Sequence, residues 1–136
     1  MMKKYIVSGG SGFIGSHIVD KLIEENNNVV VIDNNTNNRK PLINSKAQYF
    51  NIDIADNHKI DELSKILNNC EGIFHCAALI DVQESIEKPS IYELNNTIGT
   101  LNLLQAAVKA NVKKLVYSSS AAVYGDTDDI PISELN

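Results

Sequence analysis

The chain has 136 residues, a length that suits one domain with a sizeable core. Apolar residues make up 43% and charged residues 21% of it, and its net charge of -5 provides no basic surface for nucleic acid, which we exclude as a partner. Glycines interrupt the short apolar run at the N-terminus, so it fits neither a signal peptide nor a membrane-spanning helix, and we expect a cytoplasmic protein.

Short apolar runs predict five β-strands, and several are continuous, as in strands buried on both faces. The runs occupy residues 5–7, 29–32, 49–52, 73–78 and 115–117. Three sets of apolar residues at helical spacing predict intervening helices, each with one buried stripe. The sets are Ile14, Ile18 and Leu22; Ile60, Leu63 and Leu67; and Leu101, Leu104 and Val108. This alternation predicts an α/β fold with a doubly wound parallel sheet of the Rossmann type, strand order 3-2-1-4-5.

Four of the seven glycines lie in GGSGFIG at 9–15, between the first predicted strand and the first predicted helix. Gly9, Gly12 and Gly15 fit G-x-x-G-x-x-G, and Gly10 in place of Gly9 gives G-x-G-x-x-G. Such glycines permit a tight turn, close approach of the backbone to a pyrophosphate and close packing of helix on strand. The helix N-terminus then attracts the diphosphate. The stretch therefore predicts a dinucleotide site, whereas the missing G-K-[ST] excludes a Walker-type phosphate loop.

The second predicted strand ends in Asp33, eighteen residues after Gly15. A carboxylate at this position accepts hydrogen bonds from the adenosine ribose hydroxyls, and it repels a 2′-phosphate. The nearest arginine, Arg39, lies six residues farther on, in a polar connection at 34–45 with little expected helix. These features favour NAD over NADP. The alternative, in which Asp33 only caps a loop, stays open.

The histidine and the two cysteines of the middle of the chain have structural interpretations. Cys70 and Cys76 lack metal-ligand spacing, so we predict no disulfide and no metal, with Cys76 a buried free thiol. His75 is predicted to be buried and hydrogen-bonded rather than catalytic. Pro89 is predicted to open a helical stretch that continues to Ala110, because proline in a first turn forfeits no hydrogen bond.

Six sequence blocks follow one another along the chain. They are GGSGFIG at 9–15, VIDN at 31–34, NIDIAD at 51–56, FHCAALIDVQES at 74–85, NNTIGTLNLL at 95–104 and VYSSSAAVYGD at 116–126. Together they resemble the N-terminal part of an extended short-chain dehydrogenase/reductase of the nucleotide-sugar epimerase/dehydratase group, over essentially the whole chain. The 4-epimerases of UDP-hexoses are the nearest members, although dehydratases and decarboxylases of nucleotide sugars share most blocks.

The resemblance implies a set of cofactor-binding residues. Its members are Gly9, Gly12, Phe13, Ile14, Gly15, Asp33, Asn34, Asp53, Ile54, Cys76, Ala77, Ala78 and Asn96. Phe13 and Ile14 would lie along the pyrophosphate, and Asn34 would lie beside the adenosine ribose. Asp53 and Ile54 would meet the adenine, because a carboxylate can accept a hydrogen bond from its exocyclic amine.

The resemblance also implies how the site works near the nicotinamide. The run 76–80 would form the wall beside the nicotinamide ribose, and Asn96 would reach the cofactor side of the site. Ser120 resembles the catalytic serine that hydrogen-bonds the sugar hydroxyl undergoing oxidation; alternatively, it satisfies backbone groups at a strand end. The family's Tyr-x-x-x-Lys pair, in which the lysine lowers the tyrosine pKa, is expected about 25 residues later. No tyrosine of this chain is followed by lysine four residues on.

We therefore expect residues 1–136 to be the NAD-binding Rossmann domain of a nucleotide-sugar 4-epimerase. It would be truncated before the later strands and the C-terminal domain that holds the UDP-hexose, and inactive alone. The fifth strand would be an exposed edge, so we expect self-association there. Two alternatives remain: a dehydratase or decarboxylase of the same family, and a non-catalytic module that binds or senses NAD.

Overall fold

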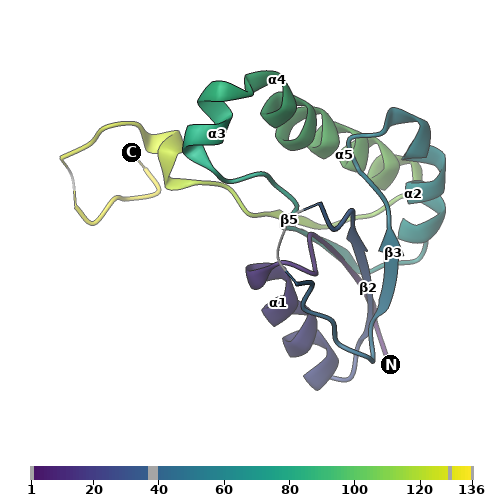
Figure 1. Cartoon of the computed structure of the whole chain (residues 1–136). Helices are drawn as coiled ribbons and strands as arrows, with labels where there is room; N and C mark the ends of the chain where they lie inside the picture. The colour runs from purple at the N-terminus through teal and green to yellow at the C-terminus, as the bar shows by residue number, and fades with distance from the viewer. Residues whose placement is uncertain (1, 37–39, 129, 136) are drawn as a thin grey trace.

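A five-stranded parallel sheet organises the chain, in the order β3-β2-β1-β4-β5 (Figure 1). This computed structural model describes residues 2–36, 40–128 and 130–135; Arg39 lies outside them. The strands are β1 (Lys4–Ser8), β2 (Asn28–Asp33), β3 (Gln48–Asn51), β4 (Gly72–His75) and β5 (Leu115–Tyr117). Every neighbouring pair is parallel. The predicted fold class and strand order are confirmed.

Helices cover both faces of the sheet. Figure 1 shows α1 (Phe13–Glu24) on one side, with α2 (Ile60–Leu67) and α5 (Gly99–Lys109) on the other. The shorter helices are η1 (Asn57–Lys59), α3 (Val82–Glu87), α4 (Pro89–Tyr92), η2 (Glu93–Ile98) and η3 (Ala121–Tyr124). Pro89 begins α4, as predicted, and η2 is π-helical, so the helical stretch runs on to Lys109.

Alternating side chains of the central strands enter two separate cores. Ile6 packs with Leu63 and Leu103 on the face covered by α2 and α5. Val7, the next residue, packs with Val19 of α1 on the opposite face. Both faces of β1 are therefore apolar and buried, which explains why its sequence is continuously hydrophobic.

The structure confirms one of the three predicted helix stripes and corrects the others. Leu63 and Leu67 of α2 are fully buried, and Ile60 packs against the same core. On α5, by contrast, Leu101, Leu104 and Val108 are 47%, 41% and 80% exposed. The buried side of α5 carries Gly99, Asn102, Leu103, Ala106 and Ala107. Its small residues let α5 pack closely against α2, so residue size outweighed the leucine spacing.

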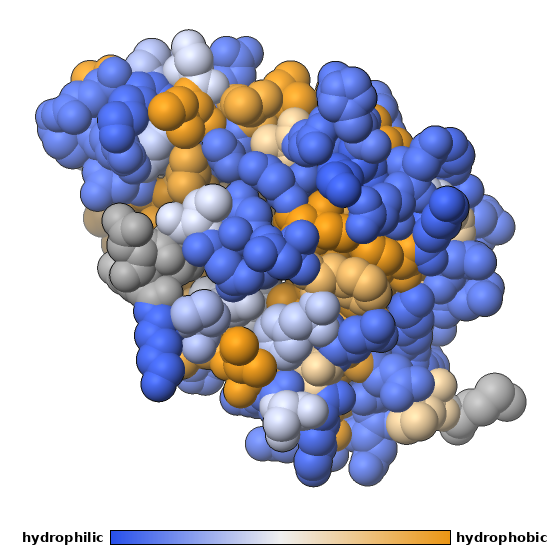
Figure 2. Space-filling view, turned by 45° about the vertical axis from the view of Figure 1, so that its right-hand side comes forward, coloured by the Kyte–Doolittle hydropathy of each residue, from blue (hydrophilic) through white to orange (hydrophobic). Residues whose placement is uncertain are grey.

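On α1 the predicted stripe is wrong at its first position. Ile14 is exposed and Ile18 only half-buried, whereas Val19 and Leu22 are buried. The helix therefore turns a slightly different face to the sheet than the isoleucine spacing indicated. Hydrophobic residues accordingly reach the surface in separate patches between hydrophilic ones, as Figure 2 shows for one face.

Two further observations hold for the part of the chain that the structure describes. It contains no group of three or more His, Cys, Asp or Glu side chains that could hold a metal ion. None of its helices has both the length and the apolar character needed to cross a membrane. Cys70 and Cys76 are free thiols.

Candidate functional site

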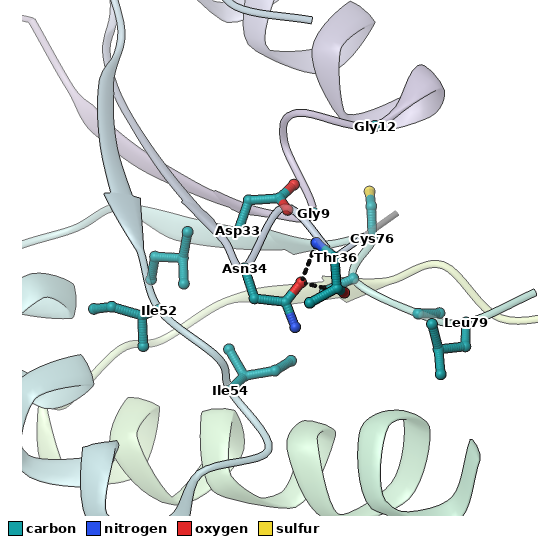
Figure 3. A pocket seen from close by; sticks show the side chains of 12 residues that line it. Gly9, Gly12, Asp33, Asn34, Thr36, Ile52, Ile54, Cys76 and Leu79 are labelled. Atoms are coloured by element: carbon teal, nitrogen blue, oxygen red, sulfur yellow. Dashed lines mark hydrogen bonds between the residues drawn. The ribbon is translucent and has the colours of Figure 1, made fainter. Parts of the chain in front are cut away.

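A pocket of about 110 Å³ lies at the carboxyl edge of the sheet, where β1, β2 and β4 end near the start of α1 (Figure 3). Its lining consists of Gly9, Gly12, Ile32, Asp33, Asn34, Thr36, Ile52, Ile54, Cys76, Ala77, Ala78 and Leu79. The chain crosses from one face of the sheet to the other between β1 and β4, which are neighbours in the sheet. Open α/β sheets bind ligands at such a switch point.

The glycine loop is shaped by two positions that exclude any side chain. Gly9 has φ +70°, and a Cβ on it would lie 2.6 Å from the backbone nitrogen of Ala77. A Cβ on Gly15 would lie 2.2 Å from the carbonyl oxygen of Gly9. Gly12 differs, since a Cβ there would meet only the Gly9 oxygen at 3.3 Å, and Gly12 itself lines the pocket. Gly9 and Gly15 thus build the turn, while Gly12 leaves room for a ligand.

The N-terminus of α1 is suited to receive an anion. Gly12 is its N-cap residue; among the described residues no side chain caps the helix, and its first turn carries no acidic residue. Unpaired N–H groups and the helix dipole make such an end attractive to a diphosphate. The side chains of Phe13 and Ile14 are exposed there and do not line the pocket, so only their backbone is available to a ligand in it.

Asp33 joins the end of β2 to the glycine loop. Its Oδ2 accepts from the backbone N–H of Ser11 at 2.9 Å, and its Oδ1 accepts from that of Asn35 at 2.9 Å. Each carboxylate oxygen accepts more than one hydrogen bond, so Asp33 retains capacity for the hydroxyls of a ribose. Asn34 Oδ1 accepts from both the backbone and the hydroxyl of Thr36, whose place in the pocket we did not predict (Figure 3). Its one signal was its position soon after Asp33.

The side of the pocket below Asn34 in Figure 3 is apolar and is supported by α5. Ile52 and Ile54 form it. Asn102 Nδ2 donates to the carbonyl oxygen of Ile54 at 2.9 Å, a support that a polar residue within an apolar helix face could have signalled. Asp53 lies exposed outside the lining, where its Oδ1 accepts from the N–H of Ala55 at 2.8 Å. Its carboxylate thus stabilises the turn after β3.

The opposite wall follows β4. Cys76, Ala77 and Ala78 line the pocket as a row, together with Leu79. Cys76 is only half-buried, so the predicted burial of its thiol is wrong: the chain leaves the sheet at this residue, and Sγ lies 3.4 Å from Ser118 Oγ. Asn96 does not line the pocket; its Oδ1 accepts from the Leu79 N–H and its Nδ2 donates to the Leu79 carbonyl, both at 2.8 Å. Asn96 therefore holds the backbone of Leu79 in place without lining the pocket itself.

Two polar residues of the sequence blocks lie outside the pocket. His75 is 1% exposed and hydrogen-bonded to Ser8 and Thr100, as predicted, and burial lowers its pKa to about 4. Ser120 is exposed beyond β5, where its Oγ accepts from the N–H of Ala122 and caps η3. Ser120 is not among the residues that line the pocket, although Ser118, two residues earlier, contacts the pocket-lining Cys76 at 3.4 Å.

Comparisons with known proteins agree with this geometry. A putative UDP-glucose 4-epimerase of Methanocaldococcus jannaschii is 43% identical over 131 residues, which cover 95% of this chain and 42% of the relative. The chain thus spans about two fifths of the length of the curated relatives it matches.

Solved structures match equally well. A UDP-N-acetylglucosamine 4-epimerase of Methanobrevibacter ruminantium, in complex with UDP-N-acetylmuramic acid, superposes with a TM-score of 0.86 at 39% identity, covering 98% of this chain and 43% of that one. A UDP-glucose 4-epimerase of Thermus thermophilus in complex with NAD gives 0.86 at 32%, covering 96% and 42%. The family model of the NAD dependent epimerase/dehydratases matches residues 5–136. The chain belongs to the NAD dependent epimerase/dehydratase family.

Proposed function

We propose that this chain is the NAD-binding part of a UDP-sugar 4-epimerase of the UDP-glucose 4-epimerase type. The observation that carries the proposal is the pocket itself: a glycine cradle and an uncapped helix end on one side, and Asp33 with spare acceptor capacity on the other. These residues fit a dinucleotide. The relatives named as UDP-glucose 4-epimerases support the substrate class.

Each side of the pocket then has a part in holding the cofactor. The backbone at Phe13 and Ile14 binds the pyrophosphate, and Asp33 with Asn34 binds the adenosine ribose. Asp53 and Ile54 meet the adenine. For direct contact, the Asp53 side chain must leave its hydrogen bond with the Ala55 N–H; otherwise Asp53 acts by stabilising the turn that holds Ile54. The wall from Cys76 to Ala78, held by Asn96 through Leu79, lies along the nicotinamide ribose.

When bound, NAD would supply a hydride acceptor for C4 of the sugar and, once reduced, a hydride donor for the opposite face of the keto sugar. Ser120 hydrogen-bonds the C4 hydroxyl, which requires the segment after β5 to approach the pocket. Proton removal needs a strong base, and the family provides one as a tyrosine paired with a lysine. Because this chain contains no Tyr-x-x-x-Lys, the 136-residue polypeptide alone should not epimerise UDP-glucose, and measurable turnover in a coupled assay would contradict this proposal.

Calorimetric titration tests cofactor binding. NAD should bind at least about tenfold more tightly than NADP, because the 2′-phosphate would meet the Asp33 carboxylate. Asp33→Ala should narrow this difference in affinity, because the variant should bind NAD more weakly and NADP more tightly. Asp61→Ala is the matched control, since Asp61 is an exposed carboxylate on α2 that does not line the pocket. Equal affinities of the two nucleotides for the unmodified chain would remove the proposed role of Asp33.

A further inference from the structure

A chain of hydrogen bonds, buried at Ser8 and His75 and partly buried at Thr100, links two neighbouring strands to a helix. Ser8 Oγ lies 2.6 Å from His75 Nδ1, and His75 Nε2 lies 2.8 Å from Thr100 Oγ1. Thr100 Oγ1 in turn donates to the carbonyl oxygen of Asn96 at 2.7 Å. Three separate elements, β1, β4 and the helix that starts at Gly99, are joined in this way through one imidazole.

The direction of every hydrogen bond in this chain follows from its last member. A carbonyl oxygen only accepts, so the single hydroxyl proton of Thr100 points to Asn96. The Thr100 oxygen must then accept from His75, which places the imidazole proton on Nε2. His75 Nδ1 is left as an acceptor, and Ser8 donates to it. Burial lowers the pKa of His75 to about 4, so the imidazole is neutral at pH 7, as this arrangement requires.

The chain ends on the residue that holds the pocket wall. Asn96 lies in the π-helical segment η2, and its side-chain amide makes both hydrogen bonds to the backbone of Leu79. Leu79 lines the pocket. A π-helical turn departs from the usual hydrogen-bond pattern, and such turns recur at functional sites. The bond from Thr100 to the Asn96 carbonyl therefore helps to fix Asn96 opposite Leu79.

We propose that His75 is a positioning residue of the cofactor pocket: its Nε2–H orients Thr100, which holds Asn96 and through it the Leu79 wall. The proposal rests on the proposed function in one respect, that the pocket binds NAD. His75 does not line the pocket, and its tautomer is set by Thr100, whose hydroxyl proton is committed to the Asn96 carbonyl. The side of the imidazole that faces Thr100 therefore carries the effect, and the side that faces Ser8 does not transmit it.

Substitutions can separate the two sides of the ring. The longer side chain of His75→Gln keeps an amide N–H near the position of Nε2. The shorter side chain of His75→Asn places its amide near Nδ1 and leaves no donor near Nε2. Thr100→Val removes the hydroxyl at nearly constant volume and leaves His75 in place, which matters if His75→Asn fails to fold. Ser8→Ala is the matched control, since it removes a buried hydrogen bond from the same ring on the other side.

Two readouts are taken on the 136-residue chain. Hydrogen exchange of the Leu79 amide, measured by NMR without ligand, should accelerate roughly fivefold or more in His75→Asn and Thr100→Val, and stay within about twofold in His75→Gln and Ser8→Ala. NAD affinity from calorimetry should fall in the same variants, roughly three- to tenfold. Urea unfolding shows whether each variant keeps its fold.

The outcomes distinguish this inference from the proposed function. If Thr100→Val and Ser8→Ala change Leu79 exchange equally, or neither changes it, His75 only stabilises the core and the inference is overturned. The same holds if NAD binds the unmodified chain and Thr100→Val with equal affinity. If the unmodified chain binds no NAD while Leu79 exchange responds as expected, the proposed function fails and the hydrogen-bond chain stands as a support of the wall.

Discussion

At the scale of single residues, local chemistry decided which roles could be predicted. Gly9, Gly15 and Asp33 belong to one continuous β-α-β unit, β1-α1-β2, so their spacing in the sequence was enough to predict their place. Asn96 was different, because its partner is the backbone of Leu79, seventeen residues away. A side chain that bonds a distant main chain leaves no periodic signal. The family resemblance named Asn96, but the sequence did not predict its contact with the backbone of Leu79.

The glycine loop permits a test that separates folding from binding. Gly15→Ala should reduce the free energy of unfolding by about 2–3 kcal/mol, because its Cβ would lie 2.2 Å from the Gly9 oxygen. Gly12→Ala should lower it by no more than about 1 kcal/mol, since its Cβ would meet only the Gly9 oxygen, at 3.3 Å, a tight contact that a shift of a few tenths of an ångström relieves. Urea unfolding measures both. Only Gly12→Ala should then lose NAD affinity while it remains stably folded, and equal unfolding energies would contradict this assignment.

The lowered pKa of His75 predicts a pH dependence of stability. Between its unfolded pKa of 6.5 and its folded pKa of about 4, the unfolded chain binds a proton that the folded chain does not. The contribution of His75 to stability therefore falls as the pH decreases through this window, and this contribution levels off below about pH 4. Between pH 7 and pH 5 the titration of His75 should reduce the free energy of unfolding by about 2 kcal/mol. His75→Gln abolishes this titration.

Urea unfolding at the two pH values checks this. The stability difference between the unmodified chain and His75→Gln should shrink by about that amount at pH 5, because carboxylates titrate equally in both proteins. A difference that stays constant with pH would show that His75 titrates alike in the folded and unfolded chain.

At the scale of elements, the sequence predicted the type and order of the strands and main helices, but it did not always predict which face of a helix is buried. The alternation of short apolar runs with helical spacing gave all five strands within a few residues. On α5, however, two stripes at helical spacing compete: the leucines at 101 and 104, and a row with Leu103, Ala106 and Ala107. Close packing against α2 favoured the smaller residues, and hydrophobicity alone ranks the two stripes in the wrong order.

A matched pair of leucines on α5 tests this assignment. Leu103 is fully buried and Leu101 is 47% exposed, although the residues lie two positions apart. Leu103→Ala should reduce the free energy of unfolding by about 2–5 kcal/mol through lost contacts and a cavity. Leu101→Ala should change it by less than about 1 kcal/mol. Denaturant unfolding measures the free energy of unfolding of both variants. A larger loss for Leu101→Ala than for Leu103→Ala would contradict the assigned orientation of α5.

At the scale of the whole molecule, the sheet order brings distant loops to one edge. The residues of the pocket come from the last two positions of β2 and from the connections after β1, β2, β3 and β4, and parallel strands place their carboxyl ends together. This rule predicted the position of the site before its shape was known. It could not predict where Ser120 lies, because the segment after β5 extends away from the sheet and packs little against it.

That segment provides a last test. None of the described residues from 119 onward is buried, and the backbone hydrogen bond to β4 after the end of β5 is made by the preceding residue, Ser118. Removal of residues 119–136 should therefore change the free energy of unfolding by less than about 1 kcal/mol. Further removal of β5 (Leu115–Tyr117) should destabilise the chain strongly, because β4 would lose its parallel partner and Leu115 its place against the core. Urea unfolding of the two shortened chains measures both effects. A large loss on removing 119–136 alone would mean that the segment packs against the rest of the chain in solution.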